Sequence, residues 1–100
     1  MGVTLENDKV IELNLLNNLK GIIPEEIGNL KYLKKLNLGF NTLVEKILLS
    51  IKNLKNLQSL ELFINHLEGN IPRELGQLTQ LQCLSLYCNR LTGNIPLELT

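Results

Sequence analysis

Leucines and other apolar residues recur along this chain at a fixed interval that is longer than a helical turn or a strand period. The clearest unit runs from Leu81 to Pro96, and most of its marked positions return 24 residues earlier. A third copy begins at Leu33, with Glu45 in place of the glycine and Leu48 in place of the proline. The best-matched pair of units shares Leu57, Leu60, Leu62, Asn65, Leu67, Gly69, Ile71 and Pro72 with Leu81, Leu84, Leu86, Asn89, Leu91, Gly93, Ile95 and Pro96. A fixed period in this range is typical of a solenoid.

Each unit predicts a short strand followed by a turn. The alternation in Leu84-Ser85-Leu86 suits a strand with one buried face. An asparagine comes three residues after the strand, where its amide can bond backbone groups that the turn leaves unpaired. Stacked units would therefore place Asn41, Asn65 and Asn89 in a structural ladder.

A short helical turn is predicted after the Ile-Pro pair of each unit. Pro72 presets the backbone for the first helical position, and Glu74 suits the positive end of the turn. Gly76 offers a left-handed exit, and Leu75 and Leu78 are expected to point into the coil.

The combined pattern, LxxLxLxxNxLxGxIPxxLGxLxx, resembles the plant-type leucine-rich repeat over residues 10–100. The resemblance implies an α/β repeat solenoid. Its expected form is a right-handed superhelix with a short parallel sheet on the concave face and short helical or 3-10 segments on the convex face. The Gly-x-Ile-Pro element implies a second short strand in each unit. Because one unit cannot bury its own leucines, the units must stack on a shared core.

The sequence divides into a leader and four units. Residues 1–9 are interpreted as a leader or the remnant of a cap, since they lack the apolar stretch of a secretory signal and have Leu5 where similar receptors carry a cysteine. The units span 10–32, 33–56, 57–80 and an incomplete 81–100. The last unit lacks a polar cap, so we expect a piece of a longer protein whose open ends could self-associate.

Two units depart from the pattern. The first is one residue short between Leu15 and Leu19, which predicts a tightened turn with either Asn17 or Asn18 at the ladder position. The second lacks the turn glycine and the proline, so the run 46–51 predicts a longer helix.

Charge and hydropathy argue against two function classes. The formal net charge of zero argues against a nucleic-acid binder, and no apolar run is long enough for direct membrane insertion. Lysines gather around the second unit, opposed only by Glu45, and predict a solvated outer surface, with an acidic partner as the alternative. These lysines are Lys31, Lys34, Lys35, Lys46, Lys52 and Lys55.

Few residues could carry chemistry. Cys83 and Cys88 would lie roughly 16 Å apart along a strand at about 3.3 Å per residue, too far for a disulfide, and are predicted to be free thiols. The single histidine, His66, is expected to face solvent in a turn, and the sequence offers no cysteine–histidine or serine–histidine–acid constellation around it. A metal site at the cysteines would need further ligands, and none is near them in the sequence. We therefore predict no enzyme, no cofactor and no metal. The start of the helical turn explains a recurring carboxylate at Glu26, Glu74 and Glu98.

Partner binding is predicted on the concave sheet, through the side chains that stand between the core leucines. Aromatic residues gather beside a polar flank, which resembles the anchors and rim of a recognition surface. Phe63 and Tyr87 are expected to be exposed, whereas Phe40 and Ile64 either join this stripe or fold into the turn. The predicted partner-binding residues are Lys35, Asn37, Phe40, Ser59, Glu61, Phe63, Ile64, Ser85 and Tyr87.

The leading hypothesis is a module that recognises a protein or peptide partner, as the resemblance to plant receptor-like kinases and inhibitors of cell-wall-degrading enzymes implies. One alternative is a structural fragment without a partner. Another is an ice-binding protein, although the regular polar row that it needs, Asn14, Asn37, Glu61 and Ser85, loses its asparagines halfway. The compartment stays open, because such repeats are usually extracellular while this sequence has neither a signal peptide nor a glycosylation sequon.

Overall fold

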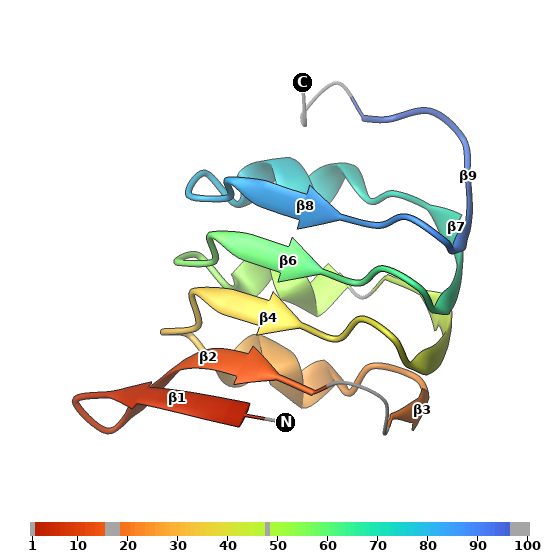
Figure 1. The fold of residues 1–100 in the computed structure, drawn as a ribbon. Coiled ribbons are helices and arrows are strands. Elements are labelled where there is room, and N and C mark those ends of the chain that lie inside the picture. Colours follow the sequence, from red (N-terminus) through yellow and green to blue (C-terminus); the bar gives the residue numbers. More distant parts are fainter. Residues whose placement is uncertain (1, 16–18, 48, 97–100) are drawn as a thin grey trace.

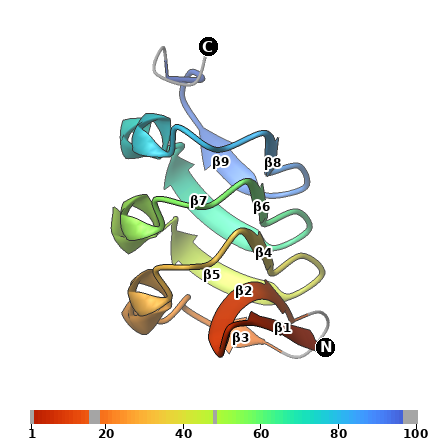
Figure 2. The same cartoon turned by 90° about the vertical axis from the view of Figure 1, so that its left-hand side faces the viewer.

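The computed structural model describes residues 2–15, 19–47 and 49–96, which form a stack of coils (Figure 1). One sheet has the order β1-β2-β4-β6-β8, formed by Gly2–Glu6, Lys9–Asn14, Lys35–Asn37, Ser59–Glu61 and Cys83–Ser85. A second sheet has the order β3-β5-β7-β9, formed by Lys20–Gly21, Thr42–Lys46, His66–Asn70 and Arg90–Thr92. Three 3-10 segments, η1 (Glu25–Asn29), η2 (Leu49–Asn53) and η3 (Arg73–Gln77), stack opposite the first sheet (Figure 2). The predicted solenoid, with its parallel sheet and its second strand in each unit, is confirmed.

The parallel strands align residues that are one repeat apart. Leu36 pairs with Leu60, and Leu60 pairs with Leu84, so each core leucine lies beside its counterpart in the next coil. The polar residues on either side of these leucines are therefore also in register. This alignment sets the columns of side chains on the outer side of the first sheet.

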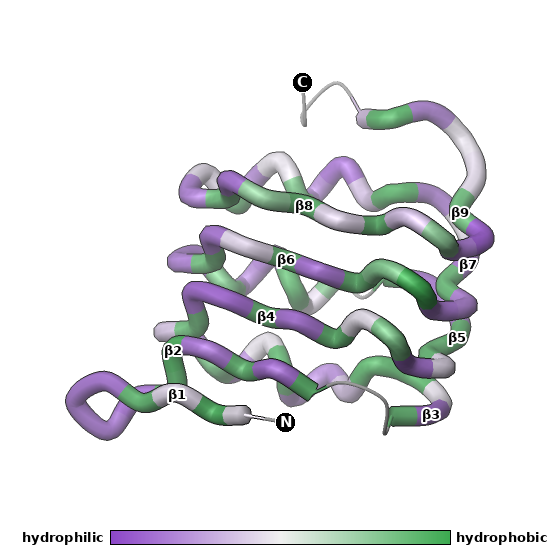
Figure 3. Tube along the Cα trace, viewed as in Figure 1, coloured by the Kyte–Doolittle hydropathy of each residue, from purple (hydrophilic) through white to green (hydrophobic). Residues whose placement is uncertain are grey.

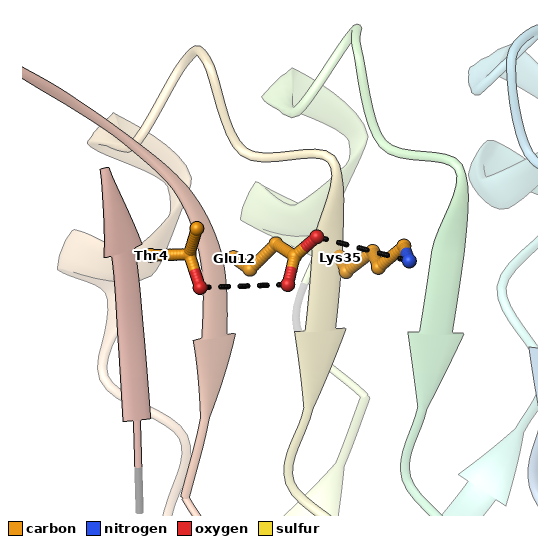
Figure 4. A network of polar contacts seen from close by, with 3 residues as sticks. All are labelled: Thr4, Glu12 and Lys35. Carbon is orange, nitrogen blue, oxygen red and sulfur yellow. Dashed lines mark hydrogen bonds and ion pairs between the residues drawn. The ribbon is translucent and has the colours of Figure 1, made fainter. Parts of the chain in front are cut away.

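An antiparallel strand covers one edge of the first sheet. β1 turns back from β2 through Asn7 and Asp8, whose φ angles of 51° and 64° give the left-handed pair that a two-residue hairpin needs. Thr4 Oγ1 donates to Glu12 Oε1 at 3.5 Å, and Lys35 Nζ lies 3.7 Å from Glu12 Oε2, so polar contacts cross β1, β2 and β4 (Figure 4). The segment interpreted as a leader thus contains a strand of the sheet.

The core is a column of aliphatic side chains between the two sheets and the 3-10 segments. Leu36, Leu60 and Leu62 are completely buried, and Leu75 and Leu78 of the third unit are also buried. Most core-facing apolar residues of the first and last coils are only partly buried, because each of these coils has a neighbour on one side; Ile23 of the first coil is an exception and is buried. The middle coils therefore hold most of the hydrophobic stabilisation.

Asparagine side chains join each coil to the one before it. Asn65 Oδ1 accepts from the backbone N–H of Leu43 at 3.0 Å, and its amide donates to the carbonyls of Leu38, Leu62 and Phe63 at 3.0, 3.1 and 3.2 Å. Asn41 and Asn89 repeat this arrangement, each reaching one carbonyl and one N–H of the preceding coil. One amide thus satisfies several turn groups that would otherwise be unpaired.

The longer helix predicted over 46–51 is wrong. Lys46 ends β5, where it pairs with Glu68 of β7, and η2 begins only at Leu49 with the same length as its neighbours. Parallel pairing with the adjacent coil outweighs the local helical tendency of this run. Leu48 lies outside the described residues, as do Asn17, Asn18 and Glu98, so the expected turn between 15 and 19 is not described.

Two local interpretations of the helical turn are also wrong. Pro24 and Pro72 precede η1 and η3 in extended conformation, with ψ of 138° and 132°, instead of occupying the first helical position. Gly76 lies inside η3 and is not among the glycines with a left-handed backbone, and the chain leaves this segment through Leu78 at φ −84°. The proline positions the turn from outside it.

Left-handed backbone occurs instead within the strands of the second sheet or directly after them. Gly21, Gly69 and Gly93 have φ of 83°, 81° and 81°, and Glu45, at the same place in the second unit, has φ of 70°. The coil geometry is therefore kept where the sequence departs from glycine, at a steric cost for the Glu45 side chain.

Replacing the central ladder residue, Asn65→Ala, should lower the free energy of unfolding by about 4 kcal/mol, because it leaves several buried backbone groups unpaired. Asn89→Ala should cost about half as much, since Asn89 is less buried and serves the outermost described turn. Urea unfolding followed by circular dichroism measures both. Equal losses for the two variants would contradict this account.

Replacing Glu45 by glycine should raise the free energy of unfolding by about 1 kcal/mol, because release of left-handed strain exceeds the added entropy of the unfolded chain. The control is Gly21→Ala, since a Cβ there would have no heavy atom within 4 Å and the change tests φ alone. That control should destabilise by about 1 kcal/mol in the same urea titration. A Glu45→Gly variant less stable than the natural chain would show that Glu45 is not strained.

Candidate partner-binding face

The outer side of the first sheet, with the strand exits beside it, is here called the sheet face. The pairing aligns Lys35, Ser59 and Cys83 in one column, and Asn37, Glu61 and Ser85 in the next. Of the predicted partner-binding residues, Lys35, Phe40 and Tyr87 are exposed, and the others are half-buried: Asn37, Ser59, Glu61, Phe63, Ile64 and Ser85. The predicted residues therefore lie on one face, but they differ in how far their side chains are exposed to solvent.

Three rings follow one another across successive coils and form the aromatic strip, Phe40, Phe63 and Tyr87. Phe40 meets Phe63 edge to face, with ring centroids 5.4 Å apart and an angle of 87°. Phe63 stacks on Tyr87 at 5.1 Å and 7°. Such pairs contribute about 1 kcal/mol each beyond the area that they bury. In Figure 3 the segment that follows β6 is hydrophobic while the strand itself is largely polar.

The structure corrects the expected exposure of Phe63 and agrees with that of Tyr87, and it places Phe40, for which two positions were open, on the surface. Phe40 is 48% exposed and Tyr87 57%, whereas Phe63 is half-buried between them. A Cβ on Gly39 would lie 2.6 Å from Phe63 Cζ, so the ring of Phe63 occupies the space that the missing side chain leaves. The Phe63 ring therefore packs directly on the backbone of Gly39. The sequence pattern did not predict this role for Gly39.

The residues directly before the ladder asparagines form a further column across the coils, and they share a left-handed backbone. Phe40, Ile64 and Cys88, each directly before a ladder asparagine, have φ of 54°, 52° and 58°. This conformation is costly for a bulky or β-branched side chain. Phe40 and Cys88 are exposed and Ile64 is half-buried, so the column lies on the sheet face more than in the turn.

A polar flank runs beside the aromatic strip. The Lys35 side chain remains 60% exposed although it pairs with Glu12, so this ion pair adds little stability and leaves the ammonium accessible. Asn37 Oδ1 accepts from the backbone N–H of Gly39 at 3.0 Å, which fixes the strand exit. Ser59, Glu61 and Ser85 complete the flank. The face thus offers exposed rings next to charged and hydroxyl groups.

The reactive side chains on and beside the sheet face are two cysteines and one histidine. Cys83 and Cys88 are free and exposed, and His66 is exposed at the start of β7. Within the ranges described, no cluster of His, Cys, Asp and Glu could hold a metal ion. In the same part of the chain, no helix is both long and apolar enough to cross a membrane.

Comparison with known sequences finds the Leucine Rich Repeat pattern at residues 32–54, 56–78 and 80–100. Comparison with curated proteins finds no match.

Solved structures with the same coil include plant receptor ectodomains. A chain of the BIR3–SERK2 complex from Arabidopsis thaliana is 32% identical, with a TM-score of 0.83, over 96% of this chain and 65% of that one. The plant peptide hormone receptor RGFR1 in complex with RGF2 is 34% identical, with a TM-score of 0.87, over 99% of this chain and 19% of the receptor chain. A chain from the structure of the Arabidopsis receptor kinase HAESA, in complex with the peptide hormone IDA and the co-receptor SERK1, is 43% identical. Its TM-score is 0.85, and the match covers 90% of this chain and 15% of that one. This chain spans less than two thirds of each matched chain.

Gly39→Ala should lower the free energy of unfolding by about 2 kcal/mol, because the new methyl group displaces the Phe63 ring. The same change made in a Phe63→Ala background should cost little, since the space is then empty. A double-mutant cycle by thermal unfolding measures the coupling. Equal costs in both backgrounds would show that Phe63 does not rest on Gly39.

Proposed function

The chain belongs to the leucine-rich repeat family, and from this premise we propose that its sheet face binds a peptide or protein partner. The aromatic strip is the observation that carries the proposal. Exposed aromatic rings are the usual energetic anchors of protein recognition surfaces, and here they line up across three coils. A parent receptor or defence protein fits this role, because RGFR1 and HAESA are solved with peptide hormones.

The exposed rings would contribute most of the binding energy. Tyr87 is exposed and has one ring face supported by Phe63, so its other face can pack an apolar side chain and its hydroxyl group can donate a hydrogen bond. Phe40 offers a second apolar contact two coils away from Tyr87, on the other side of Phe63. Phe63 holds the two apart and keeps the strip rigid, which lowers the entropy lost on binding.

The polar flank would set orientation and specificity. Lys35 favours a carboxylate on the partner, whereas Glu61 favours a cation nearby. Ser59 and Ser85 offer hydroxyl groups between these charges, and Ile64 adds apolar contact beside the strip. We infer that the partner crosses the strands, with apolar residues on the strip and polar residues on the flank.

Selection of a random peptide library on the natural chain tests the proposal. Enriched peptides should lose about tenfold or more in affinity for a chain carrying Phe63→Ala and Tyr87→Ala, measured by fluorescence anisotropy. The matched control is Tyr32→Ala, since Tyr32 is 53% exposed with Lys9 Nζ over its ring, and it precedes β4 whereas the residues of the aromatic strip follow their strands. Light scattering on each variant separates binding from self-association.

The control should bind within about twofold of the natural chain. Equal binding by the double variant, with its circular dichroism spectrum preserved, would rule out the aromatic strip as the binding site. An equal loss of peptide affinity in the double variant and in Tyr32→Ala would also rule out the aromatic strip as the binding site.

A further inference from the structure

A groove of about 470 Å³ lies away from the sheet face, between the second sheet and the 3-10 segments. Its lining comes from three consecutive coils and includes Ile22, Glu25, Glu45, Leu49, Ser50 and Glu68. Figure 2 shows β5 and β7 beside the stacked 3-10 segments from which these residues come. The volume falls in the range of sites that hold a few side chains of a ligand.

Negative charge dominates this groove. Glu25, Glu45 and Glu68 contribute three carboxylates, and Lys46 is the one cation among the described lining residues. Among the residues that the structure describes, none of these carboxylates forms an ion pair, since the recorded pair joins Lys35 to Glu12. The carboxylates therefore remain available to an external cation.

Aliphatic side chains stand beside the charges. Ile22 is 57% exposed and Leu49 53% exposed. The Oγ of Ser50, also in the lining, is buried without a hydrogen-bond partner in the described structure. The groove thus combines apolar walls with carboxylates.

Glu45 stands at the one unit where the left-handed position does not carry glycine. The residue keeps φ of 70° and places a carboxylate where Gly21, Gly69 and Gly93 have no side chain. A strained side chain that only this unit carries, in a charged groove, points to a functional constraint.

We propose that this groove binds a basic peptide segment in which arginine or lysine alternates with aliphatic residues. Charge complementarity identifies the partner, because the groove presents three carboxylates against one ammonium group. Ile22 and Leu49 take the aliphatic side chains, and the carboxylates take the cations. This site is separate from the sheet face and does not rest on the function proposed for that face.

The test uses a fluorescent Leu-Arg-Leu-Arg-Leu peptide with blocked ends, and a Leu-Gln-Leu-Gln-Leu peptide for comparison. Fluorescence anisotropy should show binding of the arginine peptide alone, and its affinity should fall as salt is raised. Glu45→Gln should weaken binding about fivefold through loss of one carboxylate. Glu45→Gly should weaken it as much, although that variant is expected to be more stable.

The matched control is Glu61→Gln, which removes the same charge from the sheet face and should change the affinity less than about twofold. Leu49→Ser should weaken the leucine-arginine peptide but not a pentaarginine peptide. Equal binding of the glutamine peptide, or an equal loss with Glu61→Gln, would overturn the proposal. A loss of affinity for the leucine-arginine peptide in the Phe63→Ala, Tyr87→Ala variant would also overturn the proposal, because the peptide would then bind on the sheet face.

Discussion

The amide of the ladder asparagine is the interaction on which the rest of the structure depends. Leucine spacing makes each coil hydrophobic on its inner side, but hydrophobic contact alone does not fix how one coil sits on the next. Asn65 supplies that information, because one planar side chain donates to carbonyls of its own and the preceding coil and accepts from an N–H of the preceding coil. All four bonds form in one register only, so each coil is aligned with its neighbour to within a hydrogen-bond length.

That alignment makes a binding surface from residues far apart in sequence. Because the strand exits coincide, the rings of Phe40, Phe63 and Tyr87 come into contact although whole coils separate them along the chain. The strip also needs Gly39, since any side chain there would occupy the place of the Phe63 ring. A repeat scaffold thus converts single substitutions at equivalent positions into a continuous feature, while the core that supports it stays constant.

The coil, its two sheets and the columns of the first sheet could be predicted from the sequence, because each follows from positions that recur in every unit. Features that depend on contacts between units could not. The run 46–51 looks helical by itself, yet Lys46 joins β5 because β7 lies beside it. Phe63 looks as exposed as Tyr87 in the pattern, yet it is covered because its neighbours are aromatic. The positions of the ladder asparagines could be predicted from the sequence. Their hydrogen-bond partners could not, because these are backbone atoms of turns in two adjacent coils.

Departures from the repeat therefore carry more functional information than its agreements. A residue that fits the pattern is explained by the coil, whether or not a partner exists. Glu45 is not explained in this way, because glycine would serve the backbone better and the other three units have it. The same unit lacks the proline, yet η2 keeps the length of η1 and η3. If these changes were only decay of the repeat, nothing would link the strained glutamate to its surroundings. Instead it shares a groove with Glu25 and Glu68, contributed by the coils on either side, and this is what separates a site from a tolerated defect.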